Sequence, residues 1–257
     1  MLEPGIADNG ADRAVELAVV MPVYNEEACI HEVLRSWLEV LSGERIDFRI
    51  LVLDDGSTDG TAEALAKFAA DTRVEIIRKA NSGHGPTILN GYARAVSIAE
   101  WAFQCDSDNE LKAGSFPTLW SARHRHDAVF GVRTGRRQSI ARRLVSAGSR
   151  LVARTLAGGA VSDPNVPYRL VRSSWLGRLV PLVPKDAFAP NIILSCALSR
   201  SRARILNCPV PHEARKTGVA AIGGWKLWQG AFRAFLQTVR YLPRLRAQAT
   251  GGPSAGD

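Results

Sequence analysis

Several features that would assign this chain to a common class are missing from its sequence. No Gly-x-Gly-x-x-Gly follows the first apolar run and no Gly-Lys-Ser/Thr occurs, which disfavours a dinucleotide site and a P-loop. The four cysteines form no Cys-x-x-Cys pair, so we expect buried free thiols in a reducing cytosol. Residues 1–14 lack a basic start followed by an apolar run, which argues against a secretory signal.

Long apolar runs and an excess of acidic residues are also missing. The longest uncharged run, Ala187–Ser199, contains Pro190 and falls short of the roughly 20 residues that span a bilayer, so we expect no membrane span. The formal net charge of +8 over 257 residues favours anionic partners such as nucleotides, phosphates and lipid headgroups. We expect no nucleic acid partner, because the basic segment described below has no interleaved aromatics and no recognised motif.

The first half of the chain alternates apolar runs with helical patterns, which predicts an α/β fold with a mainly parallel central sheet flanked by helices. The runs have the uninterrupted apolar character of strands buried on both faces. The expected strands are Leu17–Met21, Phe48–Leu53, Val74–Ile77, the run from Trp101 into Asp106, and Asp127–Val132. The expected helices are Glu27–Leu41, Ala62–Ala70 and Thr87–Ala99, with Ser57 or Thr58 as the cap of the second.

Polar clusters follow four of these strands, at the edge where such sheets bind ligands. They are Tyr24–Glu26, Asp54–Asp55, Lys79–Ser82 and Asp106–Asp108. In an extended segment, Asp106 and Asp108 face one way and Ser107 the other. Two carboxylates at a strand end suit Mg²⁺ or Mn²⁺, with a substrate diphosphate completing the shell. Each cluster alone could be a turn, but four of them at one edge favour a binding site.

Four segments together resemble the signature series of the family 2 glycosyltransferases with the GT-A fold. They are Val20–Glu27 (VMPVYNEE), Asp54–Thr61 (DDGSTDGT), Asn81-x-Gly-x-Gly and Asp106-x-Asp108. The resemblance implies a nucleotide-sugar donor and a metal that bridges its diphosphate, held by Asp106 and Asp108. The residues it assigns to the nucleotide sugar are Pro22, Tyr24, Glu26, Asp54, Asp55, Lys79 and Asn81.

The second half resembles one branch of that family, the dolichol-phosphate mannose synthases and related polyprenyl-phosphate glycosyltransferases. The matching pieces are Gly131-Val-Arg133, Arg142-x-x-x-Ser146, Asp163 with Tyr168-Arg169, and Arg215 with Gly218. The segment Ser139–Ala157, which carries the second piece, has a helical pattern with one basic and one apolar side. The resemblance implies that Arg133, Arg142 and Ser146 bind an acceptor lipid phosphate, and that Arg169 and Arg215 bind the phosphates around the reaction centre.

These observations predict an inverting, metal-dependent transfer of a sugar from a UDP- or GDP-sugar to a polyprenyl phosphate. A phosphate monoester has its second pKa near ~6, so at neutral pH it is largely dianionic and needs little help from a base. This fits the absence of an obvious catalytic histidine. We expect His124, His126 and His212 to be surface or loop residues and only His84 to lie near the site.

Two other functions remain open from the sequence. The first is a family 2 glycosyltransferase with a hydroxyl acceptor, which needs a general base, and Asp163 is its best candidate. The second is a non-catalytic protein that binds a nucleotide or an anionic membrane through its arginines. The sequence does not fix the oligomeric state.

The C-terminal part adds a second amphipathic helix, Trp225–Leu242, with Trp228, Phe232, Leu236 and Val239 on one face and basic residues opposite. Such a helix suits either the membrane interface or packing on its own domain. We expect a flexible tail over 1–14, the GT-A domain over 15–222, this helix over 223–243 and a disordered tail over 244–257. The expected location is the cytoplasm, with the cytoplasmic face of a membrane as the site of any peripheral contact.

Overall fold

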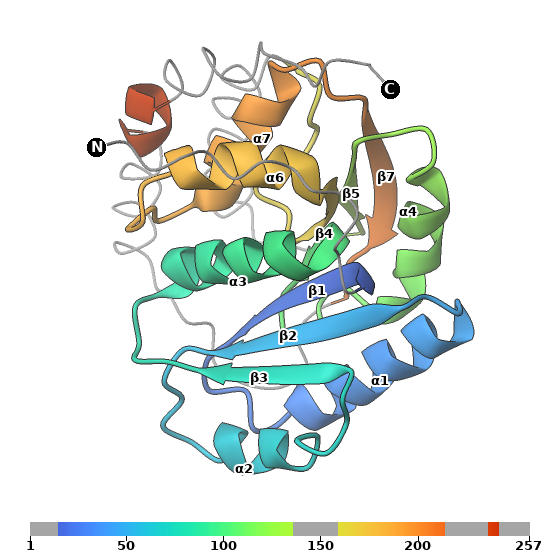
Figure 1. Cartoon of the computed structure of the whole chain (residues 1–257), viewed down its shortest axis with the longest axis vertical. Coiled ribbons are helices and arrows are strands. Elements are labelled where there is room, and N and C mark those ends of the chain that lie inside the picture. Colours follow the sequence, from blue (N-terminus) through green and yellow to red (C-terminus); the bar gives the residue numbers. More distant parts are fainter. Residues whose placement is uncertain (1–14, 136–158, 214–235, 242–257) are drawn as a thin grey trace.

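A computed structural model of the chain describes residues 15–135, 159–213 and 236–241 (Figure 1). Its centre is a seven-stranded sheet in the order β3-β2-β1-β4-β6-β5-β7. The strands are β1 (Val15–Val23), β2 (Phe48–Asp54), β3 (Val74–Arg78), β4 (Ala99–Cys105), β5 (Ala128–Thr134), β6 (Tyr168–Arg172) and β7 (Ile205–Pro211). Only β6 is antiparallel to its neighbours, and the other recorded pairings are parallel. The predicted fold class, α/β with a mainly parallel sheet, is confirmed.

Helices cover both faces of this sheet. They are α1 (Ile30–Gly43), α2 (Thr61–Ala66), α3 (His84–Ile98), α4 (Phe116–Ala122), α6 (Ser173–Leu179) and α7 (Pro190–Ser199), with short 3₁₀ turns at Ala113–Ser115 and Val180–Leu182. In Figure 1, α3 crosses in front of the sheet with α6 beside it, and both helices contact β4. Within the described residues, no helix is long and apolar enough to cross a bilayer.

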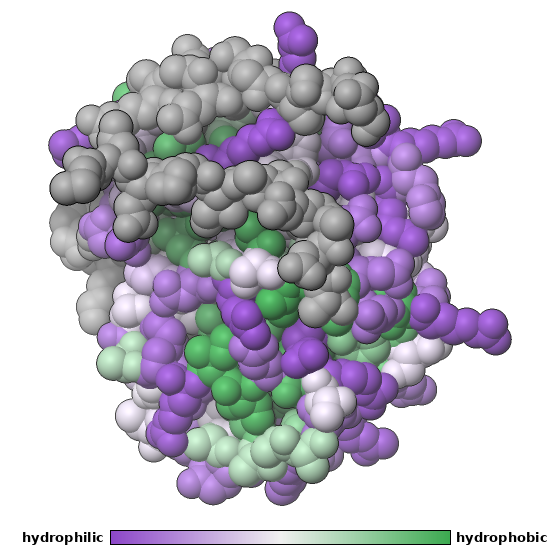
Figure 2. Space-filling view, viewed as in Figure 1, coloured by the Kyte–Doolittle hydropathy of each residue, from purple (hydrophilic) through white to green (hydrophobic). Residues whose placement is uncertain are grey.

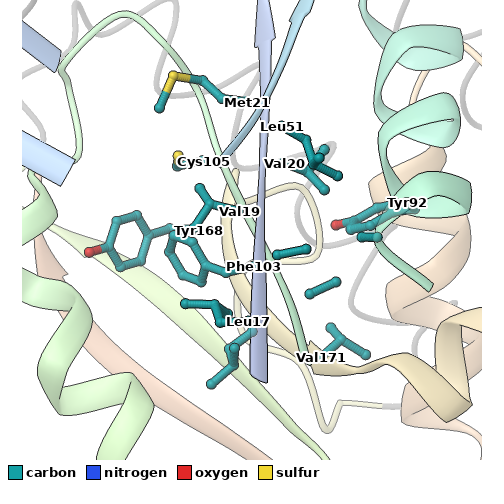
Figure 3. Packing of buried hydrophobic residues seen from close by; sticks show 14 of the residues in the cluster. Leu17, Val19, Val20, Met21, Leu51, Tyr92, Phe103, Cys105, Tyr168 and Val171 are labelled. Carbon is teal, nitrogen blue, oxygen red and sulfur yellow. The ribbon is translucent and has the colours of Figure 1, made fainter. Parts of the chain in front are cut away.

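The core lies on both sides of β1 and β4, as the alternation of a strand requires. Figure 3 shows Leu17, Val19 and Met21 of β1 on the same side as Phe103 and Tyr168, and Val20 on the side of Tyr92. The ring of Phe103 in β4 packs against those of Trp37 in α1 and Phe116 in α4, with centroid distances of 5.3 and 5.0 Å. On the other face, Tyr92 of α3 donates a hydrogen bond of 3.1 Å to the Gln104 side chain.

The predicted elements need small corrections. Helix α2 is shorter than Ala62–Ala70, and its N-cap is Gly60, not Ser57 or Thr58. The Ser57 hydroxyl accepts from the Asn25 N–H instead (3.0 Å), which joins the segments after β1 and β2. Helix α3 begins at His84, three residues before the predicted start. All four cysteines are free and buried, as expected.

The described surface is polar over most of the side shown in Figure 2, and a patch of apolar residues appears below α3, over the β2–β3 part of the sheet. Of the predicted helix Trp225–Leu242 the structure describes residues 236–241, which are helical. The remainder of that helix and the predicted helix Ser139–Ala157 lie outside the described residues, as do the two predicted tails.

Candidate active site

The predicted convergence of strand ends is present in the structure. Strands β1, β2 and β4 are parallel neighbours, so the segments that follow them emerge at one edge. The Ser107 hydroxyl donates to the Pro22 carbonyl (3.1 Å), and the Cys29 thiol donates to the Ser107 carbonyl (3.4 Å). The segment after β4 is therefore bonded to the end of β1 and to the start of α1.

The residues expected at the base and ribose lie along this edge. Tyr24 is 47% exposed, whereas Asp54 at the end of β2 is buried. Asp54 accepts the Ser57 N–H (2.9 Å), and its other oxygen lies 3.5 Å from Arg78 Nε. The Glu26 N–H donates to Thr61 Oγ1 (2.8 Å), which fixes the chain after β1 against α2. An exposed ring beside a buried carboxylate can provide stacking and a directional hydrogen-bond acceptor.

Asp55 and Lys79 hold a loop together in this structure. The buried Asp55 carboxylate pairs closely with Lys79 Nζ and accepts the N–H groups of Ser82 and Gly83, both at 2.9 Å. Burial raises the pKa of Asp55, but these hydrogen bonds and the Lys79 charge outweigh it, so the net pKa is lowered. Asn81 lies in the same loop, where its backbone N–H is against Gly56.

That contact requires a glycine at position 56. Gly56 has φ +73°, a backbone conformation that favours glycine, and a Cβ there would lie 3.0 Å from Asn81 N. The β2–α2 turn and the β3–α3 loop are thus packed backbone to backbone.

One carboxylate oxygen of Asp106 makes no hydrogen bond among the described residues. This atom, Oδ1, is buried, and His84 Nε2 lies 3.6 Å from it. Burial raises the pKa of Asp106, opposed by His84 and Arg133. A buried carboxylate oxygen without a partner is costly, and a divalent cation would satisfy it. The position predicted for His84 is confirmed.

Asp108 lies in the turn that follows, where its Oδ1 accepts the Glu110 N–H (3.1 Å). Ser107 between the two aspartates is buried, and its hydroxyl donates to the Pro22 carbonyl. Strand β4 ends at Cys105, so the extended conformation predicted for Asp106–Asp108 is not present. Among the described residues no group of three or more His, Cys, Asp or Glu side chains could hold a metal. The residues fit a cation whose remaining ligands come from a bound substrate or water.

Two residues with separate predicted roles form one ion pair. Arg133 at the end of β5 donates Nε and Nη2 to the two oxygens of Asp163, at 2.7 and 3.0 Å. Their side chains are 17% and 8% exposed. This forked geometry uses both carboxylate oxygens of Asp163. The Asp163 carbonyl also accepts the Val166 N–H (3.1 Å), which turns the chain toward β6.

Arg169 requires a correction. It is 1% exposed, and its five N–H groups are all used within the protein. They donate to the carbonyls of Pro164, Val166 and Asn191 and to the Ser195 hydroxyl, at 2.6–3.0 Å. The structure thus contradicts the predicted direct contact between Arg169 and a phosphate. Arg169 instead fixes the segment between Asp163 and β6.

Three further predicted residues, Arg142, Ser146 and Arg215, lie outside the described residues. Sequence reasoning also missed a contact beside the metal motif. His212 lies in the loop after β7, but its side chain is 8% exposed, and its Nε2 is 2.9 Å from Glu110 Oε2. The Glu213 N–H donates to the Glu110 carbonyl (3.0 Å). No sequence signal pairs these residues, because they are about 100 positions apart.

Comparison with known proteins places this chain among sequence relatives. The chain is 29% identical over 206 residues to an undecaprenyl-phosphate 4-deoxy-4-formamido-L-arabinose transferase of Pseudomonas fluorescens, covering 79% of this chain and 58% of that protein. It is 27% identical over 220 residues to the protein of the same name from Pectobacterium carotovorum, covering 84% and 65%. The chain thus spans about 60% of the length of these curated relatives.

Solved structures agree on the fold. Glucosyl-3-phosphoglycerate synthase from Mycobacterium tuberculosis superimposes with a TM-score of 0.68 at 19% identity, covering 89% of this chain and 81% of that one. The same enzyme in complex with Mn²⁺, UDP and glucosyl-3-phosphoglycerate gives a TM-score of 0.67 at 18% identity, covering 89% of this chain and 80% of that one. The predicted GT-A fold is confirmed. The family described as glycosyl transferase family 2 matches residues 18–169, more than half of the chain. On this match, and with the strand-end carboxylates in place, the chain belongs to glycosyl transferase family 2.

Proposed function

We propose that this protein is an inverting, metal-dependent glycosyltransferase that moves a sugar from a UDP- or GDP-sugar to a polyprenyl phosphate. Its family and the names of its relatives, which act on undecaprenyl phosphate, support the substrate class. The observation that carries the choice of acceptor is the Arg133–Asp163 pair. In this pair Arg133 binds both oxygens of Asp163, the carboxylate that transfer to a hydroxyl acceptor would need as its base.

The donor side rests on Asp106 and Asp108. These carboxylates would hold Mg²⁺ or Mn²⁺, and when bound the metal would act as a Lewis acid on the departing diphosphate. The unpartnered, buried Asp106 Oδ1 supports this assignment, and similar structures were solved with Mn²⁺ and UDP. Tyr24, Glu26 and Asp54, with Pro22, would orient the nucleotide. Asp55 and Lys79 would act indirectly, by fixing the loop that carries Asn81.

The acceptor side rests on Arg133. At neutral pH a phosphate monoester is largely dianionic, so its oxygen can attack without a base. It needs cations that hold it in place and offset its charge. Arg133 has a fixed orientation because Asp163 grips it at two points, and Arg169 in turn fixes the backbone beside Asp163. We assign Arg142, Ser146 and Arg215 to the same phosphate from the sequence alone.

A hydroxyl acceptor is less well supported. A general base must reach the acceptor proton, and both Asp163 oxygens already accept from Arg133. A non-catalytic binding protein is also less well supported, because it does not explain a buried carboxylate oxygen without a hydrogen-bond partner at a ligand-binding edge.

The experiment is a transfer assay with UDP- and GDP-sugars, Mn²⁺, and a matched pair of acceptors: a short polyprenyl phosphate and the corresponding polyprenol. We expect a product whose mass is that of the phosphate plus one sugar, no product from the alcohol, and no product from Asp106→Asn. Transfer to the polyprenol, or equal transfer by Asp106→Asn, would overturn the proposal.

A further inference from the structure

Four large apolar side chains are exposed in the part of the chain that the structure describes: Tyr24 (47%), Phe188 (40%), Leu236 (50%) and Val239 (44%). The last three belong to neighbouring segments. The Phe188 N–H donates to Gln237 Oε1 (2.9 Å), and Gln237 Nε2 donates to the Asp186 carbonyl (3.5 Å). We call Phe188, Leu236 and Val239 the apolar patch.

The helical segment 236–241 presents its apolar residues outward. Thr238 is 1% exposed, and Tyr241 packs against the core, so these two residues face the domain. Gln237 binds the loop that contains Phe188. Leu236 and Val239, three residues apart on one side of the helix, are about half exposed. Packing of the apolar stripe on its own domain would give the opposite orientation.

The loop that carries Phe188 contacts the start of α3, the helix that also carries His84. The loop that contains Phe188 is in close contact with Gly85, where a Cβ would lie 1.9 Å from the Ala187 carbonyl oxygen and 3.0 Å from that of Phe188. The neighbouring His84 reaches within 3.6 Å of Asp106. Gly85, which contacts this loop, therefore follows directly after His84, whose side chain lies near Asp106.

We propose that the apolar patch is a membrane-contact surface, which rests in the interface of a bilayer that contains anionic lipids. The exposed cations Lys185 and Arg240 flank it, which suits anionic headgroups, and the chain has a net charge of +8. Three side chains are too few for a stable dimer, which needs about 800 Å² per partner. The link between this surface and the acceptor rests on the proposed function: contact here would bring the metal site to a lipid-borne phosphate.

The test is co-sedimentation of the full chain with phosphatidylglycerol or phosphatidylcholine vesicles. We expect binding to phosphatidylglycerol vesicles to fall roughly tenfold for Leu236→Glu and for Phe188→Glu, since each change removes one apolar anchor. Arg240→Glu should lower it about fivefold, on anionic vesicles only. Matched controls place the same charges elsewhere: Thr118→Glu on α4 and Lys67→Glu just after α2, both at exposed positions. All variants should melt within about 2 °C of wild type.

Failure of this inference is distinguishable from failure of the proposed function, because vesicle binding needs no substrate. The inference is overturned if the wild type does not sediment with phosphatidylglycerol, or if the Leu236 and Phe188 variants bind as the wild type does. In a transfer assay, Leu236→Glu should retain full activity on a short soluble polyprenyl phosphate and lose about tenfold on a long-chain one in vesicles. If the wild type uses neither acceptor, the proposed function fails, and the sedimentation result still decides the role of the patch.

Discussion

The Arg133–Asp163 pair allows a quantitative prediction about both stability and chemistry. Its two hydrogen bonds, at 2.7 and 3.0 Å, join side chains that are 17% and 8% exposed. Removing one partner of a buried pair costs about 3–5 kcal/mol, and the partial exposure places this pair at the low end. We expect Asp163→Asn and Arg133→Met each to lower the free energy of unfolding by about 3 kcal/mol.

The double variant should lose about 4 rather than about 6 kcal/mol, which is a coupling of about 2 kcal/mol in a urea-denaturation cycle. The matched control is Arg94–Glu75, also bidentate at 2.9 and 3.0 Å but 43% and 25% exposed. The cycle of Arg94→Met with Glu75→Gln should give a coupling below about 1 kcal/mol. A coupling under about 0.5 kcal/mol for the buried pair would refute the reasoning.

The same variant separates the two acceptor chemistries. If Asp163 positions Arg133, Asp163→Asn should raise the KM for the acceptor phosphate and leave some turnover. If Asp163 is a general base, the variant should lose kcat by a factor of about 10² or more, with the KM for the acceptor little changed. The second outcome would overturn the assignment of a phosphate acceptor.

Three further predictions address the loops and the metal. The pKa of Asp55 is lowered in the folded protein, so its carboxylate stabilises the fold above the unfolded pKa of about 4, and this stability is lost as the pH falls further. In denaturation curves measured below about pH 4, the free energy of unfolding of Asp55→Asn should therefore depend less on pH than that of the wild type. Gly85→Ala should lower the free energy of unfolding by about 1–3 kcal/mol despite its better helix propensity, because its Cβ would lie 1.9 Å from the Ala187 carbonyl oxygen. Gly114→Ala is the control: a Cβ there meets nothing within 4 Å, so the same assay should show almost no change. Chelation should abolish transfer and Mn²⁺ should restore it in wild type but not in Asp106→Asn; persistent activity in EDTA would contradict the metal assignment.

The first half of the fold could be predicted because its signals are local. Strands β1 and β2 are buried on both faces, so each reads as an unbroken apolar run, and each is followed by a helical pattern. Strands β6 and β7 were not predicted. The first has five residues, two of them arginines, and the second ends in a segment with Pro209 and Pro211. Within the described residues β7 is an edge strand that pairs with β5 alone, so its prolines are tolerated.

In the candidate site, too, the local features could be predicted and the long-range contacts could not. The acids at strand ends could be predicted, because parallel strands carry their carboxyl ends to one edge. Their partners could not, because Asp163 meets Arg133 across 30 positions and Arg169 finds its acceptors on α7. An arginine in a motif was interpreted as a phosphate ligand, and only its burial shows that it binds backbone carbonyls instead. The exposure of an arginine and the acceptors that its N–H groups meet depend on contacts between residues far apart in the sequence. Those contacts cannot be predicted from a single sequence.

The position of β6 has a consequence for how this protein folds. It pairs with both β4 and β5, yet it follows β4 by more than 60 residues in the chain. Until Tyr168–Arg172 has been synthesised, β4 has an unpaired edge and β5 has no partner strand, because β7 follows β6 in the chain. A nascent chain should therefore form β1 to β4 early and wait for β6 before the sheet closes, and a chain that ends before β6 should tend to aggregate. The strand that joins β4 to β5 is thus also the last of the inner strands to be synthesised.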